Sequence, residues 1–182
     1  PCGPWTVSFY NRLKEIVFGN SCMNQSFMAL LNEYEYLNHL IEQQTGLLKE
    51  LATSELYAER IRLLRTVPGI GLLSALHLIL ELGDISRFAR AEQLAAYVGL
   101  TPSQYSSGEN VRMGRITRCG KSDLRTVLTE AAWTAIKKDT ELREVYESLK
   151  FRRGAKKAIV AVARRLLLRC RRVLLDGTPY RL

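Results

Sequence analysis

Apolar residues recur at helical spacing along most of this chain of 182 residues. From Phe27 to Leu51 they follow a seven-residue repeat, in which seven of the eight seam positions are apolar. Such a repeat predicts a helix that buries one narrow stripe against a second helix. The second helix belongs either to another copy of the chain or to residues 55–65, where Thr53 or Ser54 would supply the N-terminal cap. The seam consists of Phe27, Leu30, Tyr34, Leu37, Ile41, Gln44, Leu48 and Leu51.

The rest of the chain also favours helices. Strand patterns are nearly absent, so we predict an all-α or very nearly all-α fold, with a long coiled-coil-like helix followed by a compact helical domain. Residues 101–110 hold three serines, a proline and a glycine, and we expect a loop or a pair of short strand ends there. We divide the chain into an unassigned segment 1–23, a coiled coil or helical hairpin over 24–65, and the compact domain over 66–182. The expected later helices are one that ends at Gly83, one over 90–98, one from Ser122, one over 140–149 and one over 154–175.

A short turn, Pro68-Gly69-Ile70-Gly71, joins two of the expected helices. Pro68 stops the first helix because it has no amide hydrogen to donate, and the glycines permit a tight reversal. Such a helix-hairpin-helix turn can bind a DNA phosphate through the backbone amides of Gly69, Ile70 and Gly71, helped by the helix dipole. The alternative is a plain turn between helices that only packs the core. His77 lies among leucines and is expected in or beside that core.

Basic residues are concentrated in the C-terminal part of the chain. The whole chain has 27 Lys+Arg against 18 Asp+Glu, and residues 112–182 alone hold 19 basic and seven acidic side chains. This asymmetry indicates a polyanionic partner, whereas the alternative is a solvated basic surface. Five of these side chains recur every three or four residues after the serine-rich segment and could converge on one phosphate backbone. They are Arg112, Arg115, Arg118, Lys121 and Arg125.

Several classes of function are excluded by what the sequence lacks. No stretch of about 20 apolar residues could span a membrane, and the four cysteines and two histidines are too scattered for a metal site. No P-loop and no Ser/His/Asp arrangement is visible. What remains is Ser107, in a glycine-containing loop that precedes the arginines. A serine needs a base or a cation-polarised electrophile to act as a nucleophile, and arginines suit phosphoryl transfer because they neutralise charge on the phosphate oxygens.

Residues 64–133 contain a series of short motifs, which read V-P-G-I-G, G-D-I-S-R-F, L-A-A-Y-V-G-L-T-P, S-S-G, G-R-I-T-R-C-G and L-R. With these motifs in this order over about 70 residues, the segment resembles the C-terminal domain of the transposases of the bacterial insertion sequences 110, 116 and 902. The heptad region also lies where that family has its coiled coil.

The resemblance implies DNA recombination. In that family an N-terminal RNase H-like domain carries acidic metal-binding residues, and a serine of the C-terminal domain attacks the DNA backbone to form a phosphoserine link. An RNA transcribed from the element guides target choice. The family's serine directly precedes a glycine, which corresponds to Ser107 here, with Ser106 as the alternative. From charge and proximity we infer that Arg112, Arg115 and Arg118 line the scissile phosphate or nearby RNA.

Only about two dozen unmatched residues precede Phe27, so the acidic domain is not part of this sequence. We therefore interpret the chain as the C-terminal part of a transposase, or a truncated one, that is inert alone. Mg²⁺ is expected only in the acidic domain, and no cofactor is expected on this chain. The expected partners are DNA, a guide RNA and a second copy of the chain through the coiled coil, in the bacterial cytoplasm at the nucleoid. The alternatives are a non-catalytic helix-hairpin-helix nucleic-acid-binding module and a dimerisation fragment.

Overall fold

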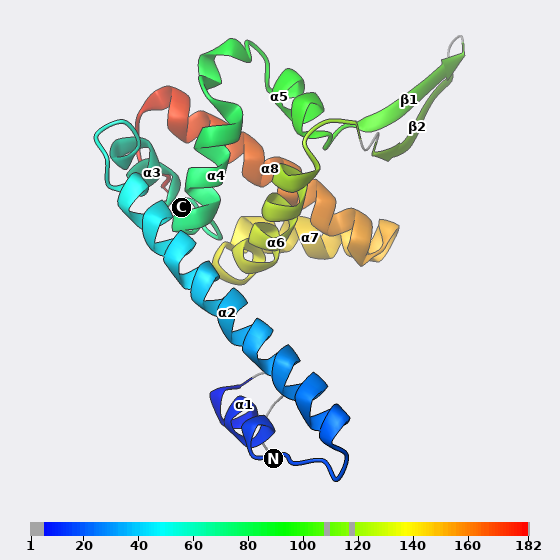
Figure 1. Cartoon of the computed structure of the whole chain (residues 1–182). Helices are drawn as coiled ribbons and strands as arrows, with labels where there is room; N and C mark the ends of the chain where they lie inside the picture. The colour runs from blue at the N-terminus through cyan, green and yellow to red at the C-terminus, as the bar shows by residue number, and fades with distance from the viewer. Residues whose placement is uncertain (1–5, 108–109, 117–118, 182) are drawn as a thin grey trace. The chain divides into compact units, whose positions relative to one another are not determined.

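The computed structural model describes residues 6–107, 110–116 and 119–181 and divides the chain into two compact units (Figure 1). The N-terminal unit is Pro1–Leu48, and the C-terminal unit is Lys49–Leu182. The predicted segment 24–65 therefore contributes to both units.

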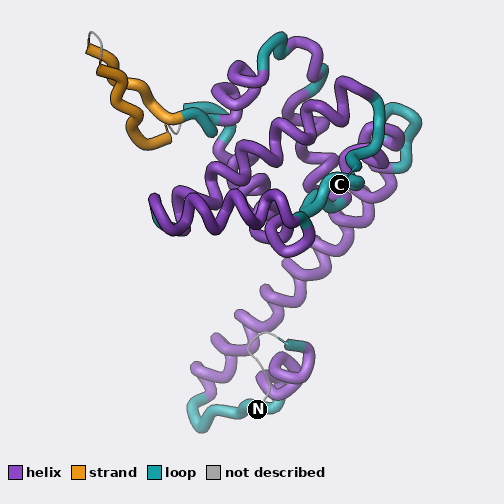
Figure 2. The backbone as a smooth tube through the Cα atoms, turned by 180° about the vertical axis from the view of Figure 1, so that it is seen from behind, coloured by secondary structure: helices purple, strands orange, loops and turns teal. Residues whose placement is uncertain are grey.

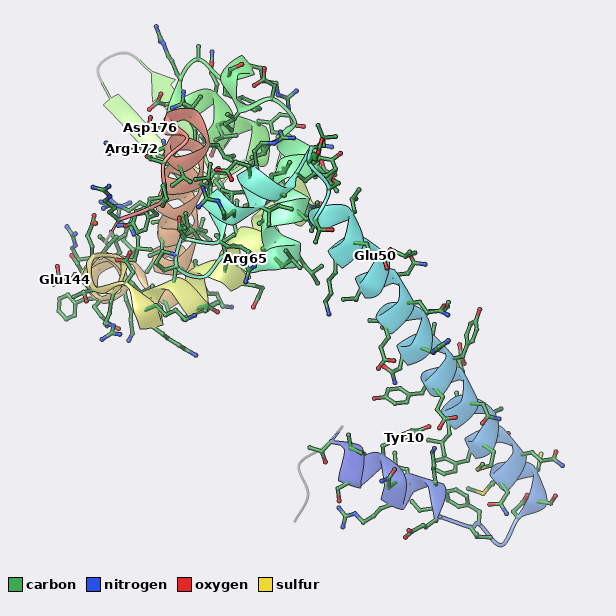
Figure 3. All side chains as sticks on the ribbon, turned by 90° about the vertical axis from the view of Figure 1, so that its left-hand side faces the viewer. Tyr10, Glu50, Arg65, Glu144, Arg172 and Asp176 are labelled. Carbon is green, nitrogen blue, oxygen red and sulfur yellow. The ribbon has the colours of Figure 1, made fainter. Side chains whose placement is uncertain are left out.

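The N-terminal unit contains α1 (Val7–Lys14) and the first part of α2 (Ser21–Ala52). Tyr10, labelled in Figure 3, joins the two helices. Its ring centroid lies 5.1 Å from that of Tyr34, and its hydroxyl donates to the Leu31 carbonyl oxygen at 3.4 Å. Lys14 forms an ion pair with Glu35. Aromatic and charged contacts thus hold α1 to the start of the long helix.

The predicted long helix is confirmed as α2, and part of its apolar stripe lies at the surface. Leu30 is 65% exposed, Leu37 49% and Ile41 62%. These seam positions are therefore accessible to another helix. The coiled coil itself stays a prediction.

The predicted start of the next helix is wrong. Helix α3 (Ala58–Leu64) begins after Tyr57, which makes no side-chain capping hydrogen bond. The hydroxyls of Thr53 and Ser54 instead donate to the carbonyl oxygens of Glu50 and Leu51, at 2.7 and 2.8 Å. These two residues thus satisfy carbonyls in the last turn of α2 rather than amides of α3.

Helices gathered around α8 (Ala155–Asp176) form the C-terminal unit, as Figure 2 shows in purple. Helix α8 contributes eight buried residues to the core, among them Leu166 and Leu167 at 0% exposure. The helical fold class is confirmed, and one two-stranded sheet is the exception among the described residues. The elements that contact α8 are α3, the 3-10 helix η1 (Ile85–Arg87), α5 (Ala91–Val98), α6 (Ser122–Lys138) and α7 (Thr140–Arg153), and α4 (Leu72–Leu82) packs against α3 and α6.

Local signals set most helix ends as predicted. Gly83 ends α4 with φ +62°, a conformation that costs glycine little. The residue that caps the following turn is Asp84, whose carboxylate accepts from the Ser86 amide at 2.9 Å. Hydrogen bonds from Ser86 also lower the pKa of Asp84. His77 is half-buried, in agreement with its predicted place beside the core. Within the described ranges, no helix combines the length and apolar character that a membrane span requires.

Candidate nucleic-acid interface

The serine-rich segment forms an antiparallel hairpin that projects from the helices of the C-terminal unit (Figures 1 and 2). Its strands are β1 (Pro102–Ser107) and β2 (Asn110–Ile116). Of the two alternatives predicted for residues 101–110, a loop and a pair of short strand ends, the second is closer, but the second strand extends beyond that segment to Ile116. Ser107 is the last residue of β1 and pairs with Asn110. The candidate nucleophile is thus at the outer end of the hairpin.

The pairing register assigns the two candidate serines to opposite faces of the hairpin. Ser107 pairs with Asn110, and Tyr105 pairs with Arg112. Because successive residues of a strand alternate between faces, these four positions belong to one face. Ser106 pairs with Val111 and therefore belongs to the other face.

The other two arginines of the predicted cluster are less closely tied to Ser107. Gly114 and Arg115 of β2 lie opposite Ser103 alone, which is the pattern of a β-bulge. Arg115 is five residues from Asn110 along β2, or roughly 16 Å at the usual strand rise. Arg112 is two residues from Asn110, or roughly 7 Å. Arg118 lies outside the described residues.

The base of the hairpin is fixed by glycines that leave no room for side chains. Gly99 ends α5 with φ +79°, and a Cβ there would lie 2.0 Å from the Cys119 carbonyl oxygen. A Cβ at Gly120, which has φ +100°, would lie 2.3 Å from the Tyr97 carbonyl oxygen. The Lys121 amide donates to that same oxygen at 3.2 Å. Both ends of the hairpin segment are therefore held against the C-terminal turn of α5.

Lys121 and Arg125, which the sequence placed in the phosphate-binding cluster, make contacts within the C-terminal unit. Nη1 of Arg125 donates to the Val98 carbonyl oxygen at 2.9 Å. Nζ of Lys121 lies 2.8 Å from Oε2 of Glu81, and this hydrogen bond raises the pKa of Lys121. Both side chains thus help to anchor the base of the hairpin. Nucleic-acid binding by them stays a prediction.

The turn at Pro68–Gly71 packs closely against α6. Gly69 has φ +89°, and a Cβ there would lie 2.3 Å from the Ala131 carbonyl oxygen. Ile70 is 6% exposed, and its amide donates to the Val67 carbonyl oxygen at 3.1 Å. Gly71 is exposed and begins α4 without a side-chain cap. Packing therefore accounts for Gly69 and Ile70, whereas the free amides of the first turn of α4 follow Gly71. Phosphate binding at this turn stays a prediction.

In the part of the chain that the structure describes, no three His, Cys, Asp or Glu side chains lie together as a metal site would need.

The sequence of this chain is similar to those of known proteins. Residues 61–147 match the family described as the IS116/IS110/IS902 family of transposases. Over these residues the chain belongs to that transposase family. The matched residues include α4, α5, both strands of the hairpin and α6.

Individual relatives extend the match beyond the family segment. The transposase for insertion sequence element IS1111A of Coxiella burnetii is 33% identical over 145 residues, which are 78% of this chain and 38% of that protein. The pilin gene-inverting protein of Moraxella bovis is 32% identical over 66% of this chain and 38% of its own length. The transposase for IS1328 of Yersinia enterocolitica is 31% identical over 54% of this chain and 30% of its own length. The chain thus spans less than two fifths of each of these relatives.

Proposed function

We propose that this chain provides the serine nucleophile and part of the DNA-binding surface of an insertion-sequence transposase, with Ser107 as the nucleophile. The observation that carries the proposal is the register of the hairpin, which assigns Ser107 and Arg112 to one face at its outer end. The family assignment supports DNA as the substrate. The pilin gene-inverting relative supports recombination as the reaction.

The proposed step is a transesterification at a DNA phosphate. The Ser107 oxygen attacks phosphorus, and a Ser–O–P bond forms while one P–O bond to a sugar breaks. The serine hydroxyl gives up its proton, and the departing sugar oxygen takes one up. Arg112 is the arginine closest along the strands to Ser107, and its charge would stabilise the negative charge that develops on the phosphate oxygens. The more distant Arg115 would bind a different phosphate.

The register also favours Ser107 over Ser106. Ser106 shares its face of the hairpin with Val111 and Met113, which offer no positive charge. Among the strand positions that the register pairs, this face has no arginine. We therefore assign Ser107 the catalytic role and treat Ser106 as the matched control.

A second copy of the chain, bound through the exposed stripe of α2, is part of the same proposal. Leu30, Leu37 and Ile41 share the heptad repeat and are at least 49% exposed, and a coiled coil would remove them from water. Sedimentation equilibrium of the intact chain tests this. We expect a mass that rises with concentration towards that of an oligomer, and a monomer at every concentration would exclude it.

The covalent link is the direct test of the catalytic proposal. The chain is supplied with the acidic domain of its family and with element RNA, incubated with target DNA, and any protein–DNA adduct is digested and analysed by mass spectrometry. We expect one nucleotide-bearing peptide that carries the modification at Ser107. An adduct at any other residue, or none from a preparation that recombines DNA, would overturn the assignment. The same reaction without RNA tests whether formation of the adduct depends on a guide RNA.

A further inference from the structure

The junction of α7 and α8 presents an aromatic ring to solvent. Gly154 alone joins the two helices, as the C-cap of α7 and the N-cap of α8. Its φ is +81° and its amide donates to the Lys150 carbonyl oxygen at 2.9 Å. In the last turn of α7, Phe151 is 94% exposed, the largest exposed fraction among the described large hydrophobic side chains. We call residues 150–157 the α7–α8 corner.

Five of the eight residues of the α7–α8 corner are basic and none is acidic. Lys150 pairs with Glu147 at 3.2 Å, and Nη2 of Arg152 donates to the Ser148 hydroxyl oxygen at 3.2 Å. The other three side chains are exposed and form no ion pair with a carboxylate of the described residues. They are Arg153, Lys156 and Lys157.

The position of the two lysines opposes helix stability. Lys156 and Lys157 lie in the first turn of α8, where the helix dipole favours anions and disfavours cations. Helix α8 has no acidic residue in that turn, and Gly154 offers no side chain as a cap. Helix α7 shows the stabilising arrangement, with Asp139 as its cap and Glu141 in its first turn. An anion bound at the start of α8 would neutralise the lysines and accept from the free amides there.

A single exposed aromatic residue is common on protein surfaces. Phe151 differs because cationic residues precede and follow it and because the adjacent helix start favours an anion. An aromatic ring next to a basic track is how proteins bind unpaired nucleic acid, since a base stacks on the ring and the phosphates meet the cations. A duplex hides the faces of its bases and would leave the ring without a partner.

We propose that the α7–α8 corner binds an unpaired stretch of nucleic acid, with one base stacked on Phe151 and neighbouring phosphates bound by Arg153, Lys156 and Lys157. The proposal rests on the nucleic-acid function proposed above and adds a strand type and a contact residue to it. It requires no chemistry at Ser107.

Binding of the intact chain to three probes tests the proposal. The probes are a single-stranded oligonucleotide of about 20 nucleotides, an abasic strand with the same number of phosphates, and a duplex of the same length. Phe151→Ala is expected to weaken binding of the single strand about tenfold or more and to leave the affinity for the abasic strand and the duplex unchanged. Phe151→Trp is expected to restore single-strand binding because the larger ring also stacks.

Two controls separate stacking from a general effect. Leu175→Ala removes a 43% exposed apolar side chain near the other end of α8 and should change no affinity. Lys156→Ala with Lys157→Ala should weaken binding of all three probes, because phosphates are common to them. An unchanged thermal unfolding midpoint shows that Phe151→Ala leaves the fold intact, as its exposure leads us to expect.

The remaining outcomes overturn the proposal in distinguishable ways. An equal loss on the single strand and the abasic strand, or no loss, would show that no base stacks on Phe151. If Phe151→Ala instead abolishes binding to phosphatidylserine vesicles and leaves single-strand binding intact, the corner binds anionic lipid. If the wild-type chain binds none of the nucleic-acid probes, the DNA-binding part of the proposed function fails as well.

Discussion

Ser107→Ala is expected to abolish formation of the covalent protein–DNA adduct and to leave DNA binding unchanged. The substitution removes the attacking oxygen, and loss of a nucleophile typically lowers a rate by roughly a thousandfold or more. Affinity for DNA depends mainly on contacts between basic side chains and phosphates. Serine carries no charge, so its replacement removes none of these contacts. The measurement is the rate of adduct formation in the complete reaction, together with a binding titration of the same preparation.

Ser106→Ala is the matched control for this substitution. It removes the same group one residue away, on the opposite face of the hairpin, and should retain both adduct formation and DNA binding. If Ser106→Ala abolishes the adduct while Ser107→Ala retains it, the two serines exchange roles and the register argument fails. If both variants form the adduct at the wild-type rate, neither of these two serines is the nucleophile.

Helices were predictable from this sequence because their signals are local. The apolar periodicity and the glycines at 83 and 99 predicted where two helices end, and the structure has a helix boundary at each. The end predicted at residue 149 is wrong, because α7 runs to Arg153 and ends at Gly154. The caps of α3 were not predictable, because a serine or threonine hydroxyl bonds an amide ahead of it or a carbonyl behind it with equal chemistry. In the structure the hydroxyls of Thr53 and Ser54 donate to carbonyl oxygens that precede them in the chain.

The hairpin lies beyond what local patterns determine. Its first strand reads Pro-Ser-Gln-Tyr-Ser-Ser and shows no alternation of apolar and polar residues. The register, which decides whether Ser106 or Ser107 shares a face with Arg112, is set by pairing between the strands and shifts by one residue near Ser103. A one-residue slip would exchange the faces. The sequence favoured Ser107 over Ser106 by its position before a glycine, and the strand pairing adds an independent argument for the same choice.

Spacing of basic residues alone does not reveal which cations are used within the protein. Arg125 looks like its neighbours in sequence, yet its guanidinium donates to the Val98 carbonyl oxygen, 27 residues away. Phe151, the contact residue proposed above, was not singled out because the predicted helix ended at residue 149, whereas α7 runs to Arg153. The signal that could have identified it is its setting in the sequence Lys-Phe-Arg-Arg-Gly-Ala-Lys-Lys.

A buried carboxylate at the start of α7 joins several parts of the C-terminal unit. Asp139 is 1% exposed. Its Oδ1 caps α7 by accepting from the Leu142 amide at 2.9 Å, and its Oδ2 accepts from Nη1 of Arg169 and, at 3.3 Å, from the Tyr180 hydroxyl. The Arg169 guanidinium lies 5.0 Å from the centroid of the Tyr180 ring. Tyr180 in turn donates its amide to the Thr66 hydroxyl oxygen at 2.8 Å.

Asp139→Ala is therefore expected to lower the free energy of unfolding by about 3 kcal/mol, because Arg169, whose side chain is only 14% exposed, loses its buried partner and keeps only the exposed Glu141 carboxylate, 2.6 Å from its Nη2. Loss of the cap of α7 contributes about 1 kcal/mol of this. Asp139→Asn keeps a good capping group and an acceptor but loses the charge, so we expect a smaller loss of about 2 kcal/mol. The measurement is urea unfolding of the intact chain, followed by circular dichroism.

The ion pair at the end of α8 provides the control on the same helix. Nε of Arg172 lies 3.3 Å from Oδ2 of Asp176, with both side chains at least 50% exposed (Figure 3). Exposed pairs contribute about 0 to 1 kcal/mol, so Asp176→Ala should change stability little. If Asp139→Ala destabilises the chain no more than Asp176→Ala does, Asp139 does not hold α7, α8 and the C-terminal segment together. If it does so by several kcal/mol more, the buried carboxylate fixes the framework from which both the hairpin and the α7–α8 corner project.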